Sequence, residues 1–323
     1  MLWSILCVRI FSEMIHKNIY NEITWIDLEN PTTEEVRLLM KKYDLDPLVA
    51  NEILTPTFRP RVDVHEDYIY LILHFPIPLS KNVKNEDEPQ HKIQEIDFII
   101  GKKFIITTHY ETVDALHDFS KVFEVNSILS KIDIGSHAGY IFFFMIQYLY
   151  RMLHNQVESI RDTIDTIEDK IFKGKEKECL LELSLLKRTL IILKSSMSAH
   201  KEVISAFEMA AEGFFGTDFK YHSRAIFGEY QKVKNSVTSI KEYLDELRET
   251  NNSLLHAKQN ETMRVFTVLA FFTFPLSLFA SIFGMDMRAT PLIDHPYGFW
   301  IVVSIMLALT VIMIFFFKKK NLL

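Results

Sequence analysis

The sequence predicts an α/β domain at its N-terminal end, a long helical stalk after it, and two transmembrane helices at its C-terminal end. Three observations predict this fold class. The C-terminal end holds two long apolar stretches without a charged side chain. The segment before them carries a sustained heptad pattern, and about the first 130 residues alternate between helical and strand-like character.

Composition excludes several classes of protein. The chain of 323 residues has a net charge of −6, which gives no sign of a nucleic-acid partner. Its two cysteines, Cys7 and Cys179, form no CxxC motif, which argues for a reduced compartment without a disulfide framework. Met1 to Phe11 faintly resembles a signal peptide, but Arg9 interrupts the apolar run and no small-residue cleavage site follows, so a buried strand is the preferred interpretation.

Residues 1–135 are expected to form the α/β domain. Thr32 to Tyr43 has the pattern of a helix, with Thr32 or Thr33 as the cap before Glu35. Two runs rich in β-branched and aromatic residues, Tyr68–His74 and Asp97–Thr108, predict strands. Gly101–Lys103 is expected to form a turn inside the second run, and Asn85–Gln90 is expected to form a charged loop between the two runs.

Residues 136–262 are expected to form the stalk. Two apolar stripes predict two antiparallel helices, and a turn marked by Gly213 and Gly216 leads into a long helix over Thr217–Glu261. Asn251 on the seam of this helix either sets register or is a solvated interruption. The stripes are Ile160, Ile164, Ile167, Ile171 and Leu183, Leu186, Leu190, Leu193, Met197; the seam is Ile226, Tyr230, Val233, Val237, Ile240, Leu244, Leu247, Asn251 and Leu254.

The two apolar stretches have the length of membrane spans, because about 20 residues cross a hydrocarbon core of about 30 Å. The expected segments are a first span, an outer loop, a second span and a basic tail, at residues 263–287, 288–296, 297–317 and 318–323. Lys318, Lys319 and Lys320 close the second span, and Lys258 and Arg264 lie just before Val265–Met285, the uncharged stretch of the first span. The positive-inside rule therefore places both termini in the cytoplasm.

The first span carries a row of polar residues. Ser277 and Ser281 are four residues apart and share a helix face, which Asp286 extends by roughly one turn. The row is either a helix-packing surface or the lining of a polar lumen. Because one polar stripe cannot enclose a pore, a lumen would require several copies assembled around an axis. Pro275 lies within the same span, where it frees one backbone carbonyl.

Signals of catalytic chemistry are absent. The chain contains no phosphate-binding glycine loop, no GxGxxG, no HExxH and no GxSxG, so the sequence predicts neither an enzyme nor a nucleotide-binding protein. His65, Glu66 and Asp67 are adjacent and point in different directions, which disfavours a metal site. His109 and Glu111 are expected to be exposed polar residues.

Several segments resemble the CorA magnesium transporter family. The resemblance is densest at the first span and extends over most of the chain, although the family's Gly-Met-Asn motif reads Gly-Met-Asp here. The segments that carry it are Trp25–Leu28, Arg59–Asp63, Glu95–Ile99, Asn260–Val265, Pro275–Ser277 and Ile282–Asp286.

This resemblance implies a homopentameric Mg²⁺ channel in the cell membrane, shaped like a funnel, with five first spans around the pore and membrane lipid around the second spans. It implies influx of hydrated Mg²⁺ driven by the membrane potential, with Co²⁺ or Ni²⁺ as further ions, and no resident cofactor; Mg²⁺ would be cargo and regulator. The implied filter is Gly284, Met285 and Asp286, with Asp286 as the metal-binding residue; the implied pore lining is Asn260, Met263, Phe266, Phe274, Ser277 and Ser281.

Two departures from the family pattern leave alternatives open. Five carboxylates in place of five amides would bind hydrated Mg²⁺ more tightly and would titrate as a unit. Ala225 stands where the family has a stalk carboxylate that senses Mg²⁺, and Glu229 and Glu249 are only nearby acids. The alternatives to a Mg²⁺ channel are a transporter of Co²⁺, Ni²⁺ or Zn²⁺ and a membrane-anchored scaffold that conducts nothing.

Overall fold

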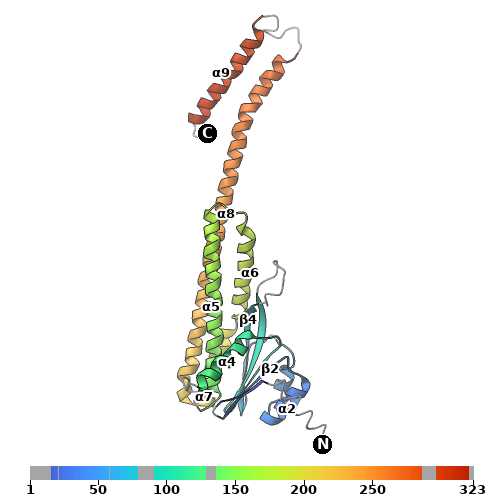
Figure 1. Cartoon of the computed structure of the whole chain (residues 1–323), viewed down its shortest axis with the longest axis vertical. Coiled ribbons are helices and arrows are strands. Elements are labelled where there is room, and N and C mark those ends of the chain that lie inside the picture. The colour runs from blue at the N-terminus through green and yellow to red at the C-terminus, as the bar shows by residue number, and fades with distance from the viewer. Residues whose placement is uncertain are drawn as a thin grey trace. The chain divides into compact units, whose positions relative to one another are not determined.

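The computed structural model describes residues 16–20, 22–57, 59–78, 91–128, 136–285 and 296–319. The chain divides into two compact units, residues 1–247 and 248–323 (Figure 1). The expected N-terminal strand and the charged loop after the first β-rich run lie outside the described residues.

A six-stranded mixed sheet forms the centre of the first unit, in the order β1-β2-β6-β5-β4-β3. Strands β2 and β6 are parallel, and the other neighbours are antiparallel. Both predicted β-rich runs are confirmed, the second as β5 and β6 joined at the expected turn. The strands are β1 His16–Tyr20, β2 Ile23–Glu29, β3 Val62–Val64, β4 Tyr68–Pro78, β5 His91–Gly101 and β6 Phe104–His109.

The predicted first helix is confirmed as α2, Thr33–Tyr43. Thr32 is its cap: its hydroxyl accepts from the Glu35 amide, and the Glu35 carboxylate accepts from the Thr32 amide at 2.8 Å. This reciprocal capping box satisfies two amides that the first helical turn leaves without partners. The short α3, Pro47–Glu52, follows with Asp46 as its cap.

The two faces of the sheet bury different layers. Helices α2 and α3 cover one face through a cluster that includes Val36, Leu39, Val49, Tyr70 and Ile72. Aromatic contacts join the other face to the remaining helices of this unit. These are Trp25 to Phe119 of α4 (Asp114–Ile128), Phe98 to Phe142 of α5 (Gly139–Phe172), and Phe75 to His200 of α7 (His200–Phe215).

More helices precede the long helix than the two that the stripes predicted. The second stripe belongs to α6, Cys179–Ser196, and a break at residues 197–199 separates it from α7. Sequence reasoning missed α4 and α7 because neither carries a long regular stripe. Gly213 lies inside α7, so only Gly216, with φ of 99°, supplies the turn, which a residue without Cβ adopts at low cost.

The long helix is confirmed as α8, which runs without interruption over Lys220–Phe283 after the 3₁₀ turn Thr217–Phe219. Its predicted seam is buried up to Asn251, and Leu254 is half-buried. Asn251 is therefore not a solvated interruption. The Tyr243 hydroxyl lies 3.1 Å from Asp165 and 2.7 Å from Glu168, which fixes α8 along α5.

A buried polar link joins the helices to the sheet. The Tyr150 hydroxyl of α5 donates to Nδ1 of His200 over 2.6 Å, and Nε2 of His200 donates to the His74 carbonyl of β4 over 2.7 Å. His200 is 0 % exposed. Burial lowers its pKa to about 4, so the ring is neutral and both of its nitrogens are paired.

His109 is buried, which corrects the expectation that it is an exposed polar residue; Glu111 is exposed as expected. The ring Nδ1 lies 2.7 Å from the Glu111 carbonyl, and Nε2 lies 3.4 Å from the Asp27 carboxylate. Burial alone would lower the pKa of His109, but hydrogen bonding and charge from Asp27 outweigh it, so the pKa is raised. The pairing arises because β2 and β6 end side by side.

This raised pKa predicts a loss of stability in mildly alkaline solution. The folded state holds the His109 proton more tightly than the unfolded state. The resulting contribution to the free energy of unfolding is therefore complete below about pH 6.5 and is lost as the pH rises through the raised pKa of His109. We expect the unfolding midpoint of His109→Gln to change less between pH 6 and 9 than that of wild type. The midpoints are measured by circular dichroism. An equal dependence of the midpoint on pH in the two proteins would contradict the raised pKa of His109.

Candidate functional site

Two helices are long and apolar enough to cross a membrane. They are the C-terminal part of α8 and the whole of α9, Gly298–Lys319, and the apolar windows of both are exposed rather than buried inside the protein. Pro275 lies within α8 without ending it. A soluble core helix would be covered by other elements, so this exposure favours the membrane prediction.

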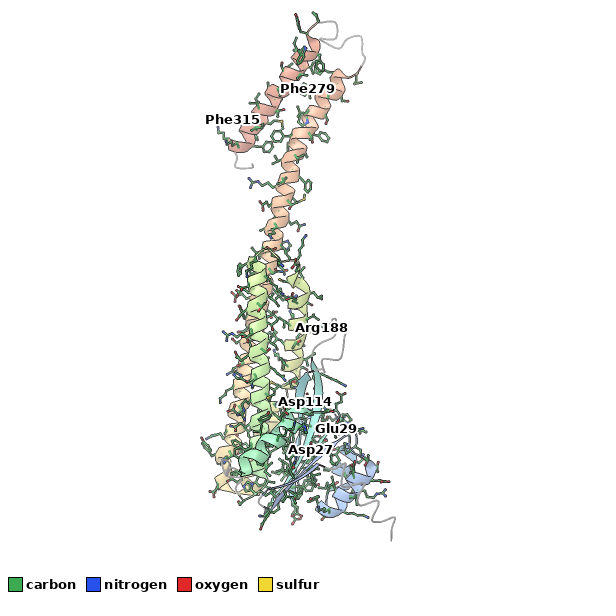
Figure 2. The ribbon with its side chains drawn as sticks, in the orientation of Figure 1. Asp27, Glu29, Asp114, Arg188, Phe279 and Phe315 are labelled. Atoms are coloured by element: carbon green, nitrogen blue, oxygen red, sulfur yellow. The ribbon has the colours of Figure 1, made fainter. Side chains whose placement is uncertain are left out.

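The part of α8 in the second unit packs against α9 through one stripe of apolar residues. Phe317 of α9 lies 5.9 Å from Phe271 and 5.5 Å from Phe272, measured between ring centroids. Buried and half-buried residues recur along both helices at spacings of three and four, as expected for two helices in contact. They include Val268, Phe272, Leu276, Phe279 and Phe283 of α8 (Figure 2 labels Phe279) and Val302, Met306, Leu309, Met313 and Phe317 of α9.

The predicted pore-lining residues lie on the other side of α8. Each residue advances a helix by about 100°, so Ser281 and Met263 lie about 180° from Phe272, and the remaining lining residues lie at least about 120° from it. All of them are exposed, and Phe274 is 79 % exposed. The structure thus brings Asn260, Met263, Phe266, Phe274, Ser277 and Ser281 onto one uncovered face, called here the open face of α8.

Gly284 ends this helix within the predicted filter. Its amide donates to the Ala280 carbonyl over 2.9 Å, and a Cβ added to it would lie 3.0 Å from the same oxygen. A larger residue would press on the carbonyl, which explains why glycine suits this position. Met285 follows and is about half exposed. Asp286, the predicted metal-binding residue, lies outside the described residues, so its role stays a prediction.

The side chains on the open face change in chemical character along the helix. From the C-terminal end of α8 toward its N-terminal end, this face carries the two serine hydroxyls, then Phe274 and Phe266, and then Met263 and Asn260. Hydroxyl oxygens suit a hydrated cation, whereas an aromatic constriction can exclude water. A single copy presents these groups to one side only.

The stalk provides no metal centre within one chain. Ala225 is half-buried and has no ligand atom in its side chain, Glu229 is paired with Lys232 at 2.8 Å, and Glu249 is exposed. Among the described residues, no group of three or more His, Cys, Asp and Glu side chains is arranged to hold a metal ion.

Two buried acids in the first unit escaped sequence reasoning. Glu95 and Asp97 of β5 are 2 % and 1 % exposed. A signal was present, because residues two apart on a strand share a face and both acids lie among apolar neighbours. Their partners could not be foreseen, since these come from distant parts of the chain.

Known proteins resemble the chain along nearly its whole length. The family model described as "CorA-like Mg2+ transporter protein" matches residues 20–319. The cobalt/magnesium transport protein CorA of Thermotoga maritima is 25 % identical over 92 % of this chain and 83 % of its own length. The corresponding protein of Methanocaldococcus jannaschii is 22 % identical over 93 % of this chain and 91 % of its own.

Solved structures agree on the fold. The complete structure of the CorA magnesium transporter from Methanocaldococcus jannaschii superposes with a TM-score of 0.79 at 19 % identity, covering 94 % of this chain and 92 % of that one. The predicted fold class is thereby confirmed. The match over residues 20–319 includes the sheet of the first unit and both apolar helices, so this chain belongs to the CorA-like Mg²⁺ transporter family.

Proposed function

We propose that the chain is a divalent-cation channel that admits Mg²⁺ through the cell membrane, as a homopentamer with five copies of α8 around the pore. The observation that carries the proposal is the open face of α8, which α9 leaves uncovered and which holds every described lining residue. Family membership supports the same conclusion. Mg²⁺ is the transported ion and a candidate regulator, and no resident cofactor is proposed.

A ring assembly follows from the geometry of one copy. An uncovered face with two serines and an asparagine is costly against lipid, whereas it is hydrated when several copies surround an aqueous axis. With both termini in the cytoplasm, an inward-negative potential drives cations inward. A potential of 100 mV contributes about 4.6 kcal/mol for a divalent ion, so no nucleotide is required.

Asp286 distinguishes this proposed pore from the family pattern. A ring of carboxylates at the outer mouth would hold Mg²⁺ through its retained waters, because Mg²⁺ sheds its hydration shell reluctantly. Below it, the serine rings would accept the hydrated ion, and Phe274, Phe266 and Met263 would form a hydrophobic gate that opens by hydration. The carboxylates would also share protons, since several like charges around one axis cannot all ionise independently.

A second candidate is a channel that prefers another divalent ion. The change from an asparagine to an aspartate ring alters the group that would select the ion, and the Thermotoga maritima relative is named for cobalt as well as magnesium. Carboxylate oxygens suit Mg²⁺, whereas softer ligands suit Co²⁺, Ni²⁺ and Zn²⁺. The described open face offers no His or Cys, so Mg²⁺ remains the first choice.

Reconstitution tests the proposal. Purified full-length protein in liposomes is given an inward-negative potential, and uptake of Mg²⁺, Co²⁺, Ni²⁺ and Zn²⁺ is measured for wild type and for Asp286→Asn. We expect wild-type Mg²⁺ uptake to rise with the potential. Removing five carboxylates should change the ratio of Mg²⁺ to Ni²⁺ uptake by about tenfold, which corresponds to about 1.4 kcal/mol.

Three outcomes separate the hypotheses. Uptake by neither protein refutes the channel and favours the scaffold. Uptake of Ni²⁺, Co²⁺ or Zn²⁺ in preference to Mg²⁺ favours the second candidate. Unchanged selectivity and rate in Asp286→Asn would show that this residue is not the filter.

A further inference from the structure

The side of α8 that carries the open face continues beyond Asn260 toward the N-terminal end of the helix. Each residue advances a helix by about 100° and about 1.5 Å, so His256 lies about 6 Å before Asn260 along the axis. Around the axis, His256 lies within about 20° of Met263 and in line with Phe274. All four residues belong to the second unit, in which α8 is unbroken up to Phe283. The imidazole therefore extends the row of predicted pore-lining side chains.

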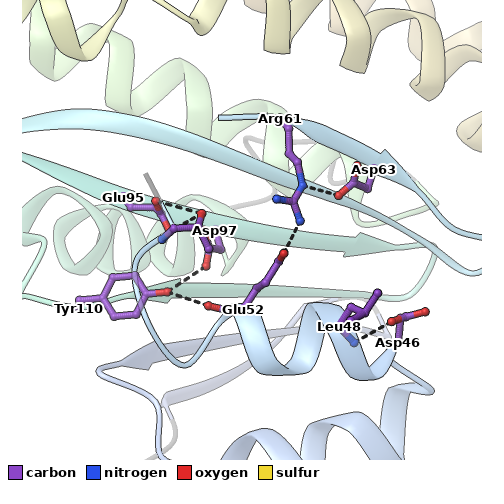
Figure 3. Close-up of polar contacts among 9 residues, drawn as sticks. Asp46, Leu48, Glu52, Arg61, Asp63, Glu95, Asp97 and Tyr110 are labelled. Atoms are coloured by element: carbon purple, nitrogen blue, oxygen red, sulfur yellow. Dashed lines mark hydrogen bonds and ion pairs between the residues drawn. The ribbon is translucent and has the colours of Figure 1, made fainter. Parts of the chain in front are cut away.

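The ring of His256 is exposed and available to a ligand. Among the described residues, it takes part in no hydrogen bond, ion pair or ring contact. Titratable groups in the first unit differ, because the fold already provides their partners. Glu52 pairs with Arg61. Asp97 accepts a hydrogen bond from Tyr110, as Figure 3 shows. Imidazole nitrogens that the protein leaves without such partners can bind a metal ion from solution.

The charges near His256 favour a cation on its side of the helix. Lys258 is the nearest basic residue in the sequence, but it lies about 160° from His256 around the axis. Arg264 lies about 80° away and about 12 Å further along the helix. Glu249 is exposed, lies within about 20° of the direction of His256, and precedes it by about two turns. The nearest charge on the side of α8 that bears His256 is therefore an acid.

A single imidazole is too few ligands for a metal site, which takes three or four. Within one chain, no group of three or more His, Cys, Asp and Glu side chains among the described residues is arranged to hold a metal ion. The proposed pentamer changes this, because a closed ring repeats every residue around its axis. Five copies of His256 would then converge one helical turn beyond Asn260, at the inner end of the pore.

We propose that five His256 side chains form a binding site for a transition-metal cation of the class of Ni²⁺, Co²⁺ and Zn²⁺, and that an ion held there blocks the flow of Mg²⁺. The inference rests on the proposed pentameric channel. Imidazole nitrogens bind these ions, whereas Mg²⁺ prefers oxygen ligands and keeps its waters. The ring would therefore let hydrated Mg²⁺ pass and retain the softer ion. A retained charge on the axis would repel the next cation, which makes the ring an inhibitory site at the inner end rather than a second selectivity filter.

Calorimetric titration with Ni²⁺ tests the site directly. Full-length protein without a polyhistidine tag is kept in detergent with an excess of Mg²⁺, which occupies carboxylate sites. We expect about one Ni²⁺ ion per five chains, because one ring supplies one site. His256→Gln should weaken this binding at least about tenfold, since glutamine offers no imidazole nitrogen. His117→Gln, at an exposed histidine of α4, is the matched control and should leave the binding unchanged.

Electrical recording tests the block. The Mg²⁺ current through the protein in a planar bilayer is measured while Ni²⁺ is added to one side at a time. We expect Ni²⁺ to block from the side of the first unit, and His256→Gln should need about tenfold more Ni²⁺ for the same block. The block from that side should persist in Asp286→Asn, because the proposed carboxylate ring lies at the other end of the pore.

Three results would overturn the inference. The first is wild-type Ni²⁺ binding that is absent or that His256→Gln leaves unchanged. The second is binding of one ion per chain, which would place the site within a single copy. The third is a Mg²⁺ current that bound Ni²⁺ does not reduce.

Failure of the proposed channel has a different signature, namely a wild type without Mg²⁺ current. Calorimetry still decides the metal site in that case, because it measures binding without transport. Size-exclusion chromatography checks that His256→Gln assembles like wild type. An intact fold is expected, because His256 is exposed and glutamine is a good helix former.

Discussion

Replacing Ser281 with phenylalanine is expected to abolish Mg²⁺ uptake while the protein still folds. Ser281 lies on the open face of α8, about half a turn of the helix from the stripe that packs on α9. In the proposed pentamer, five added rings would fill the lumen just below the filter. We expect uptake to fall at least a hundredfold, which corresponds to a barrier increase of about 2.7 kcal/mol.

A matched control lies on the neighbouring helix. Leu307 of α9 is exposed and lies outside the stripe that contacts α8, so Leu307→Phe makes a similar apolar addition to a surface that would face lipid. We expect its uptake to equal that of wild type. Full uptake by Ser281→Phe would show that the open face is not the pore lining, whereas equal loss in both variants would indicate a general disturbance of the spans.

Replacing His200 with alanine is expected to destabilise the first unit by roughly 3 to 5 kcal/mol. The change leaves the Tyr150 hydroxyl and the His74 carbonyl buried without partners, each at a cost of about 1 to 3 kcal/mol, and creates a cavity. Urea denaturation monitored by tryptophan fluorescence measures this loss of stability, because Trp25 lies in the core of the first unit.

The pH dependence of the free energy of unfolding provides a second check on the role of His200. The pKa of His200 is lowered to about 4, so wild type should lose stability as the pH falls from about 6.5 toward 4, and His200→Ala should lack this part of the slope. Tyr221→Phe removes a hydroxyl from an exposed side chain and should be neutral. A loss below 1 kcal/mol in His200→Ala would show that the buried link contributes little.

Periodicity in the sequence was sufficient for the long elements. The seam from Ile226 to Leu247 has the spacing of a buried helix face, and the uncharged stretch that follows can only satisfy its backbone in a membrane as a helix. Local chemistry was also sufficient to place the start of the capped helix at Thr32 or Thr33 before Glu35, and the structure assigns the capping box to Thr32. Such features depend on neighbours in sequence, so the sequence determines them.

The elements without strong periodicity were less predictable. Helix α7 was missed, because it carries no long regular stripe and the break before it contains neither glycine nor proline. Gly213 looked like a turn residue, yet it lies inside a helix, since glycine permits a turn without requiring one.

The sequence by itself determined the two long apolar helices, the heptad seam, the capped helix and the shared face of Ser277 and Ser281, because each follows from a fixed number of residues per turn. Tertiary structure alone decided that α9 covers the opposite face of α8. It also decided that His109 is buried against Asp27, that His200 links three elements, and that the buried Asp97 accepts hydrogen bonds from the Thr108 and Tyr110 hydroxyls. These depend on burial and on partners from distant strands and helices, which set the charge state of a titratable group and are not encoded in local spacing.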